Sequence, residues 1–166
     1  MKQIVIFYSR ADENYFGGKM RYLSVGNTEK IARMIAGIRG ADLFKIEQKV
    51  PYAADYNTCI EEAKKDLKEN VRPELVSTLD NMDEYDEIYI GFPNYWGTMP
   101  MAVFTFLEQF DWSGKTVHPF VTHEGSGFGK SKADLENVCK GAVFTKGLAI
   151  SGSSVDHART EVEGWV

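Results

Sequence analysis

The sequence predicts an α/β protein built on one parallel, doubly wound sheet, and two observations carry this prediction. Short, nearly continuous apolar runs rich in β-branched residues recur along the chain, as at residues 4–8 and 88–92. Such runs are typical of strands buried on both faces in a parallel sheet. Segments with the spacing of amphipathic helices lie between them, which favours right-handed βαβ crossovers. We therefore expect a five-stranded sheet with helices on both faces.

The strands are expected where the apolar runs lie. Residues 4–8, 88–92 and 117–121 are three of them, and the shorter runs 43–46 and 147–150 complete the predicted sheet. Helices are expected where apolar residues repeat at helical spacing. The first covers residues 29–37, with Thr28 placed to cap its start. The apolar positions of the four predicted helices are Ile31, Met34, Ile35 and Ile38; Ile60, Ala63 and Leu67; Val103, Phe106, Leu107 and Phe110; and Val155, Ala158, Val162 and Trp165.

The 166 residues are expected to form one domain, residues 1–166, because no internal repeat, low-complexity tract or linker divides them. Two connections are long, residues 10–25 and residues 47–85. The second contains the predicted helix around Ile60. The first has no clear periodicity, and loops of that length are usually functional or mobile.

The composition and the charge limit the kinds of function that the protein can have. Hydrophobic residues make up 43% and charged residues 26%, as in ordinary soluble proteins. The net charge of −5 disfavours nucleic-acid binding. No stretch reaches the ~20 apolar residues of a membrane span. The apolar run at residues 4–8 is too short for a signal peptide, and Cys59 and Cys139 stand far apart, so we expect a cytoplasmic protein.

The polar segments that follow the predicted strands indicate where a ligand binds. In an open parallel sheet, the ligand crevice lies beyond the carboxyl ends of the strands. Ser9 and Arg10 follow the first strand, and Gly26, Asn27 and Thr28 open the next helix. A helix N-terminus offers unpaired N–H groups and a positive dipole end, so this segment suits a phosphate. Simple helix capping is the alternative interpretation.

Two further segments follow the third and fourth predicted strands. One places two aromatic residues on a turn, which suits a flat heterocycle unless these rings only fill core space. The other is rich in glycine and can present backbone N–H groups to a ring edge, or serve only as a flexible connection. The two segments comprise Pro93, Asn94, Tyr95, Trp96 and Gly97, and Thr122, His123, Glu124, Gly125, Ser126 and Gly127.

Other kinds of site are disfavoured. Residues 124–131 approach the P-loop pattern, but Glu124 stands where that pattern requires glycine. His123 and Glu124 begin an H-E-x-x-H pattern in which Gly127 replaces the second histidine, so no metal site is predicted. The G-x-S-x-G turn of serine hydrolases is also missing from the sequence.

The three polar segments, in this order and each after a predicted strand, resemble the flavodoxin family, above all its short bacterial flavodoxin-like members. The resemblance covers nearly the whole chain. It implies strand order 2-1-3-4-5 with noncovalent FMN at the switch point of the sheet. It also implies that Ser9, Asn27 and Thr28 hold the flavin phosphate, that Gly26 gives the backbone room, and that residues 93–97 and 122–127 flank the flavin. The family's phosphate loop is usually contiguous, whereas residues 11–25 are inserted here.

The resemblance leaves three functions open. The chain is an electron carrier for a redox partner protein, an NAD(P)H-dependent FMN oxidoreductase that reduces quinones or similar small acceptors, or a flavin-free domain of this fold. In the second case, the inserted segment with Tyr15, Phe16 and Tyr22 could roof a substrate pocket. The oligomeric state is left open.

Overall fold

The computed structural model describes residues 2–166 and is centred on a parallel sheet with the strand order β4-β1-β5-β6-β7. A further strand, β8, pairs with the carboxyl half of β6, whereas β7 pairs with its first residues. The fifth position of the predicted sheet is therefore shared by two short strands, and the predicted order is confirmed. The strands are β1 (Lys2–Phe7), β4 (Asp42–Lys45), β5 (Tyr85–Pro93), β6 (Thr116–His123), β7 (Val143–Phe144) and β8 (Leu148–Ser151).

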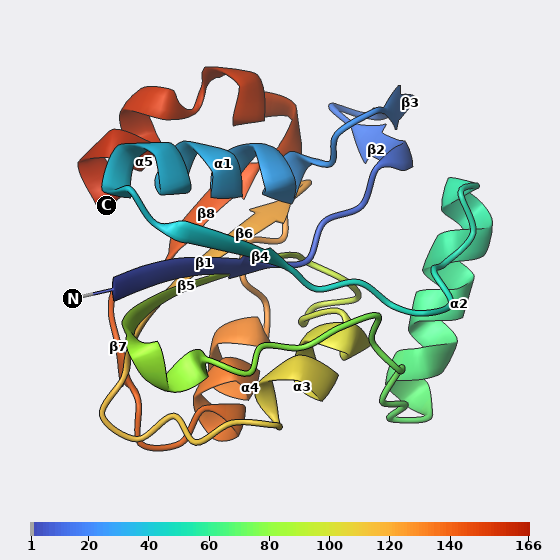
Figure 1. Ribbon diagram of the computed structural model, residues 1–166. Coiled ribbons are helices and arrows are strands. Elements are labelled where there is room, and N and C mark those ends of the chain that lie inside the picture. The colour runs from blue at the N-terminus through green and yellow to red at the C-terminus, as the bar shows by residue number, and fades with distance from the viewer. Residues whose placement is uncertain (1) are drawn as a thin grey trace.

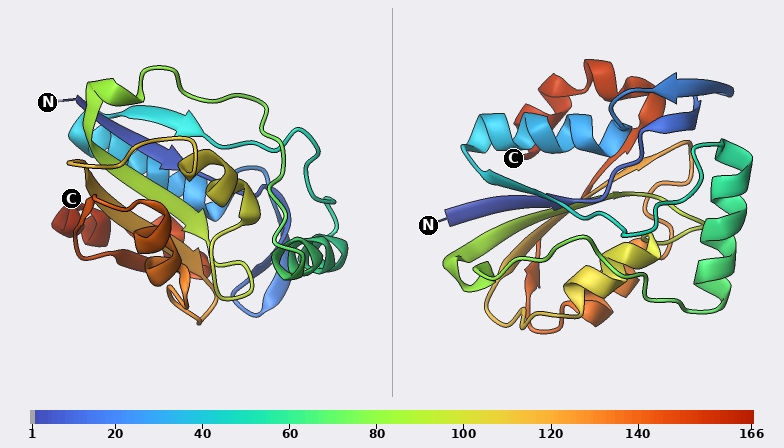
Figure 2. Two further views of the ribbon diagram at one scale, coloured as in Figure 1. Left: turned by 90° about the horizontal axis from the view of Figure 1, so that it is seen from below. Right: turned by 45° about the vertical axis from the view of Figure 1, so that its right-hand side comes forward.

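Helices cover both faces of the sheet, as the sequence predicts. Figures 1 and 2 show α1 (Asn27–Arg39) and α5 (Arg159–Trp165) on one face, with α3 (Met101–Leu107) and α4 (Ser131–Val138) on the other. Two 3₁₀ helices, η1 (Met82–Glu84) and η2 (Gly152–His157), precede β5 and α5. The helix predicted around Val155 and Trp165 is thus divided into η2 and α5.

The side chains of β1 show why residues 4–7 of this strand form a continuous apolar run. Ile4 and Ile6 are buried in the core layer on the α3 face, whereas Val5 and Phe7 are buried in the layer on the α1 face. Successive side chains of a strand point to opposite faces, so a strand with a core on each side needs a continuous apolar run.

Helix α2 (Tyr56–Lys68) has a different position from the other helices. It stands beyond the carboxyl ends of the strands, across the edge of the sheet, and covers neither face (Figure 1). Asp55 caps it, because the Asp55 carboxylate accepts a hydrogen bond of 2.8 Å from the Thr58 N–H. The helix therefore forms a wall at the edge where the sequence predicts the ligand site.

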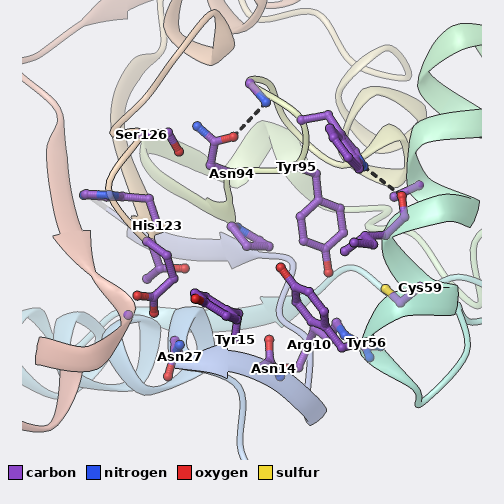
Figure 3. A pocket seen from close by; sticks show the side chains of 18 residues that line it. Arg10, Asn14, Tyr15, Asn27, Tyr56, Cys59, Asn94, Tyr95, His123 and Ser126 are labelled. Atoms are coloured by element: carbon purple, nitrogen blue, oxygen red, sulfur yellow. Dashed lines mark hydrogen bonds between the residues drawn. The ribbon is translucent and has the colours of Figure 1, made fainter. Parts of the chain in front are cut away.

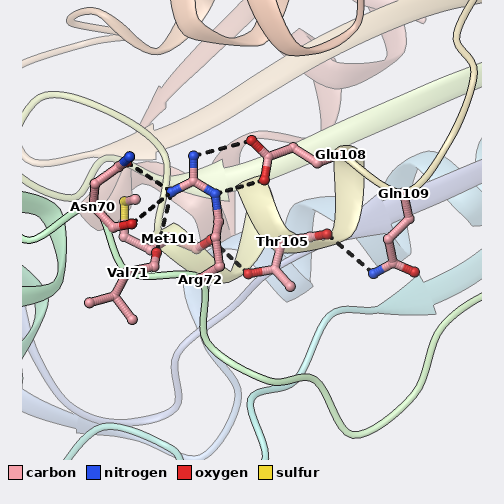
Figure 4. Close-up of polar contacts among 7 residues, drawn as sticks. All are labelled: Asn70, Val71, Arg72, Met101, Thr105, Glu108 and Gln109. Atoms are coloured by element: carbon pink, nitrogen blue, oxygen red, sulfur yellow. Dashed lines mark hydrogen bonds and ion pairs between the residues drawn. The ribbon is translucent and has the colours of Figure 1, made fainter.

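Arg72 fixes the chain that returns from α2 to the sheet (Figure 4). Its Nε and Nη2 donate hydrogen bonds of 2.7 and 3.1 Å to the two carboxylate oxygens of Glu108, at the end of α3. Its Nη1 donates a bond of 2.9 Å to Oδ1 of Asn70. The guanidinium also lies 5.1 Å from the centre of the Phe104 ring. One side chain thus joins the connection after α2 to the α3 face of the sheet.

The inserted segment, in which the sequence shows no periodicity, is an antiparallel hairpin. Its strands are β2 (Asp12–Phe16) and β3 (Lys19–Leu23). Gly17 and Gly18 form the turn with φ of 60° and 88°. Two positive φ angles are typical of the type I′ turns that join hairpin strands, and glycine adopts them without strain.

The predicted cap of α1 is wrong. Thr28 lies inside the helix, buried, and its Oγ1 is 2.7 Å from Oγ1 of Thr122 on β6. Gly26 is the N-cap residue, without a side chain to accept a bond. Ser9 takes this role from the end of β1, since its Oγ accepts a bond of 3.0 Å from the Glu29 N–H. The Ser9 hydroxyl, which is distant in sequence, therefore caps the helix in place of the Thr28 hydroxyl.

None of the helices in residues 2–166 is long and apolar enough to cross a membrane.

Candidate functional site

A pocket of about 320 Å³ lies at the carboxyl edge of the sheet. It is bounded by the ends of β1, β5 and β6, by α2 and by the inserted hairpin (Figure 3). Ligand pockets are commonly concavities of this order of size, and in open parallel sheets they lie at this edge. The three polar segments of the sequence therefore meet in one place.

Most of the sequence-predicted site residues line this pocket. They are Arg10, Asn27, Pro93, Asn94, Tyr95, Trp96, Gly97, Thr122, His123, Glu124 and Ser126. The others do not contribute to its lining: Ser9, Gly26, Thr28, Gly125 and Gly127. Ser9 and Thr28 hold α1 in place through the contacts described above, and Gly125 donates its N–H to Nδ1 of His123 at 2.9 Å.

Gly26 marks a close approach of two backbone segments. A Cβ atom at this position would lie 2.2 Å from Oγ of Ser9 and 2.5 Å from the carbonyl oxygen of Arg10. The start of α1 is therefore pressed against the end of β1, and only glycine allows this. With the Glu29 N–H bonded to Ser9, the N–H groups of Asn27 and Thr28 are the donors of the first turn for which no partner is found within residues 2–166.

Three buried polar atoms on the pocket residues have no hydrogen-bond partner within the described part of the chain. They are Nε of Arg10, Oδ1 of Asn27 and Oη of Tyr95. Buried polar groups are nearly always hydrogen-bonded, so such atoms together at one pocket indicate a polar ligand. A half-turn of the Asn27 amide would present its NH₂ donors in place of the oxygen.

Arg10 has a mainly structural part at this site. Its Nη1 donates a bond of 2.9 Å to the carbonyl oxygen of Ala53, and its Nη2 donates to Glu13 and Ala54 at 3.0 and 2.7 Å. These carbonyls belong to the base of the hairpin and to the segment before α2. The guanidinium therefore holds these two walls of the pocket together, and its Nε has no hydrogen-bond partner within the described part of the chain.

The loop after β5 is a tight turn that presents Trp96. Tyr95 and Thr98 exchange backbone hydrogen bonds of 2.9 and 3.2 Å, and φ is 55° at Trp96 and 87° at Gly97. The indole Nε1 donates a bond of 2.8 Å to the Ile60 carbonyl on α2, and Nζ of Lys64 lies 5.1 Å from the ring centre. The indole is thus fixed between the turn and α2.

Asn94 joins the second and third segments, and Figure 3 shows its hydrogen bond within the second. Its Oδ1 accepts a bond of 2.8 Å from the Gly97 N–H, and its Nδ2 donates one of 2.8 Å to the Gly127 carbonyl. Both loops are therefore fixed relative to each other by this one side chain.

Glu124 and Gly152 form the side of the pocket next to Asn27. A Cβ atom on Gly152 would lie 2.5 Å from Oε1 of Glu124 and 2.7 Å from Nδ2 of Asn27. Partial burial raises the pKa of Glu124, and the Gly17 N–H that it accepts opposes this. Burial also raises the pKa of Tyr95 well above its usual value, so this phenol stays protonated at neutral pH.

Six pocket residues were missed from the sequence: Asn14, Tyr56, Cys59, Ile60, Ala63 and Gly152. Asn14 and Tyr15 belong to the hairpin, whose Gly17-Gly18 pair is a turn signal that could have revealed it. Four others belong to α2, and its amphipathic spacing does not indicate what the helix packs against. Of the three aromatic residues named for the inserted segment, Tyr15 lines the pocket and Tyr22 is 70% exposed. The side chain of Phe16 lies outside the described residues.

Comparison with known proteins adds a family and several similar structures. A family model described as flavodoxin matches residues 19–166. A protein from Bacteroides uniformis, assigned as a flavoprotein, is 28% identical with a TM-score of 0.77, over 99% of this chain and 96% of that chain. A flavoprotein from Lactobacillus acidophilus, solved in complex with FMN, is 23% identical with a TM-score of 0.67, over 94% and 97%. A Fusobacterium nucleatum flavodoxin bound to flavin mononucleotide is 15% identical with a TM-score of 0.57, over 99% and 95%. No functionally curated protein matches the chain.

Proposed function

The chain belongs to the flavodoxin family, and on this premise we propose that it binds FMN noncovalently in the pocket at the carboxyl edge and transfers electrons through it. FMN itself supplies the redox chemistry, so the protein has to bind it, orient it and set its electrostatic surroundings. The flavoprotein of L. acidophilus and the flavodoxin of F. nucleatum, both solved with FMN, support this choice of cofactor.

One observation carries the proposal. A helix N-terminus with available N–H groups borders the pocket, and three buried polar atoms without a partner among the described residues belong to side chains that line it. Asn27 and the first turn of α1 would hold the phosphate, because N–H donors and the helix dipole favour an anion there. Ser9 and Gly26 would act through the placement of that turn.

The remaining walls of the pocket suit a flat ring. Tyr95 and Trp96 bring aromatic surface to the pocket from the β5 loop, and the Asn94 contacts keep this loop beside residues 122–127. Aromatic faces and backbone polar groups are what a planar heterocycle with a polar edge requires. We propose that the Trp96 indole packs on the flavin ring, because the turn and the Ile60 carbonyl hold this aromatic residue in place.

Purification tests the cofactor directly. The purified protein should be yellow, with the absorption bands of bound flavin, and heat denaturation should release FMN in about one equivalent per chain. If purification removes the flavin, added FMN should restore these bands. A colourless protein to which FMN does not bind would leave only the flavin-free alternative.

The second candidate is an NAD(P)H-dependent oxidoreductase acting on quinones or similar small acceptors. The observation that favours it is the hairpin, because β2 adds a wall to the pocket that would shield a small acceptor from water. For the electron carrier, the net charge of −5 favours a redox partner with a basic surface. Mixing the FMN-loaded protein with NADPH and a quinone separates the two, since the carrier alone should oxidise NADPH only slowly.

A further inference from the structure

The hairpin is fixed at its base to the N-terminal end of α2. The Glu13 N–H donates a bond of 3.3 Å to the Ala54 carbonyl, and Oε1 of Glu13 accepts one of 2.9 Å from the Tyr56 N–H. The Arg10 guanidinium adds its bonds to the Glu13 and Ala54 carbonyls. The first residues of β2 are therefore held beside α2 by several bonds.

The tip of the hairpin lies on the opposite side of the pocket. The Gly17 N–H donates a bond of 3.4 Å to Oε2 of Glu124, in the loop after β6. A Cβ atom on Gly17 would lie 3.3 Å from Cβ of Ser153, in η2. Strand β2 thus spans the pocket mouth from α2 to the β6 and β8 loops.

Tyr15 lies in this span with its ring at the pocket. Figure 3 shows it between Asn27 and Tyr56, and it belongs to the pocket lining. Its ring centre is 6.2 Å from that of Tyr56 at an interplanar angle of 35°, and the side chain is 41% exposed. Among the described residues its hydroxyl has no hydrogen-bond partner, so this side chain is held by its backbone and one tilted ring contact.

We propose that Tyr15, carried across the pocket mouth by the inserted hairpin, packs on the planar ring of the bound flavin and determines how tightly that ring is held. The inference rests on the proposed FMN function. Hydrogen bonds near both ends of β2 hold the strand in place, whereas the ring of Tyr15 is half exposed. An aromatic ring on a planar heterocycle adds binding energy through burial and stacking. The inserted hairpin thereby adds a contact with the flavin ring to the pocket. The start of α1, proposed to hold the phosphate, borders the same pocket.

Titration of the apoprotein with FMN and with riboflavin, followed by flavin fluorescence, tests this role. Tyr15→Leu should raise the dissociation constant about tenfold, the size expected for loss of one stacked aromatic ring. The factor should be the same for riboflavin, which has the ring but no phosphate. Tyr15→Phe should restore wild-type affinity within about twofold, because only the ring is required.

Tyr22→Leu is the matched control, since Tyr22 belongs to the same hairpin, is 70% exposed and does not line the pocket. It should bind both ligands as the wild type does. Equal affinities of Tyr15→Leu and wild type for both ligands would overturn the role of Tyr15, as would an equal loss in Tyr22→Leu. If the wild-type protein binds neither ligand, the FMN proposal itself fails, which is a separate outcome.

Discussion

At the scale of single residues, Gly26 shows how one residue type positions the candidate site. The side of this residue where a side chain would stand is filled by the Ser9 hydroxyl and the Arg10 carbonyl. The first turn of α1 can therefore reach the pocket edge, and its N–H groups lie where the proposed phosphate binds. Glycine is required here because a side chain would have no space. The backbone angle does not require it, since any residue can adopt a φ of −66°.

Gly26→Ala should lower the free energy of unfolding by about 1–3 kcal/mol, as in other overpacked sites, and should weaken FMN binding. Urea denaturation and FMN titration measure the two effects. Gly37→Ala in the same helix is the control, because a Cβ atom there meets nothing within 4 Å. It should raise stability by about 0.5–1 kcal/mol. Equal behaviour of the two variants would contradict the close approach at Gly26.

Glu124 gives a prediction about pH. Partial burial raises its pKa above the ordinary value of 4.5, so the folded apoprotein binds this proton more tightly than the unfolded chain does. The contribution of Glu124 to the free energy of unfolding is therefore complete below pH 4.5 and is lost as the pH rises through the pKa of the folded state. Glu124→Gln should therefore be more stable than the wild type at pH 7, with a difference that disappears in acid.

Denaturation of the apoprotein between pH 4 and pH 8 would measure this difference. Glu61→Gln, an exposed change of the same kind on α2, should follow the wild-type curve. A Glu124→Gln variant that is less stable than the wild type at pH 7 would show that the bond to the Gly17 N–H outweighs the effect of burial.

At the scale of elements, the loops after β5 and β6 are bound to each other by one side chain. Asn94→Ala removes the acceptor of the Gly97 N–H and the donor to the Gly127 carbonyl together. Groups left unpaired in this way cost about 1–3 kcal/mol each, so we expect the FMN dissociation constant to rise at least about tenfold. Asn94→Asp keeps only the acceptor, so its FMN dissociation constant should lie between those of the wild type and of Asn94→Ala.

Fluorescence titration of these variants gives the affinities, and their melting temperatures reveal any general loss of stability. Asn57→Ala removes an amide from an exposed position of α2 outside the pocket and should bind FMN normally. Wild-type affinity in Asn94→Ala would mean that the two loops need no fixed relation for flavin binding.

The elements differ in how well the sequence predicts them, for physical reasons. The strands with a core on both faces, such as β1, were predicted within a few residues because burial on both faces demands continuous apolar runs. The hairpin strand β3 is exposed at all but its last residue, so no burial pattern marks it. The predicted Thr28 cap is wrong because Ser9, twenty residues before Glu29 in the sequence, supplies the oxygen that bonds to the Glu29 N–H.

For the whole molecule, the sheet edge and the loops after β5 and β6 could be predicted as the place of the site, but the wall that α2 forms could not. The rule that parallel strands end at one edge brings residues 93–97 and 122–127 together from sequence alone. The position of α2 depends on long-range contacts such as the Arg72–Glu108 ion pair, which joins segments 36 residues apart. The α2 residues of the pocket, from Tyr56 to Ala63, therefore had no signal in the sequence that pointed to a ligand.

The central claim is that α1 holds a flavin phosphate while the loops and the hairpin hold the flavin ring. The dissociation constants of FMN and riboflavin for the wild-type apoprotein test it most directly, because the two ligands differ only in the phosphate. Charge-assisted bonds at a helix N-terminus should make FMN bind at least about a hundredfold more tightly. Equal affinity for the two ligands, or no binding of either, would contradict the account.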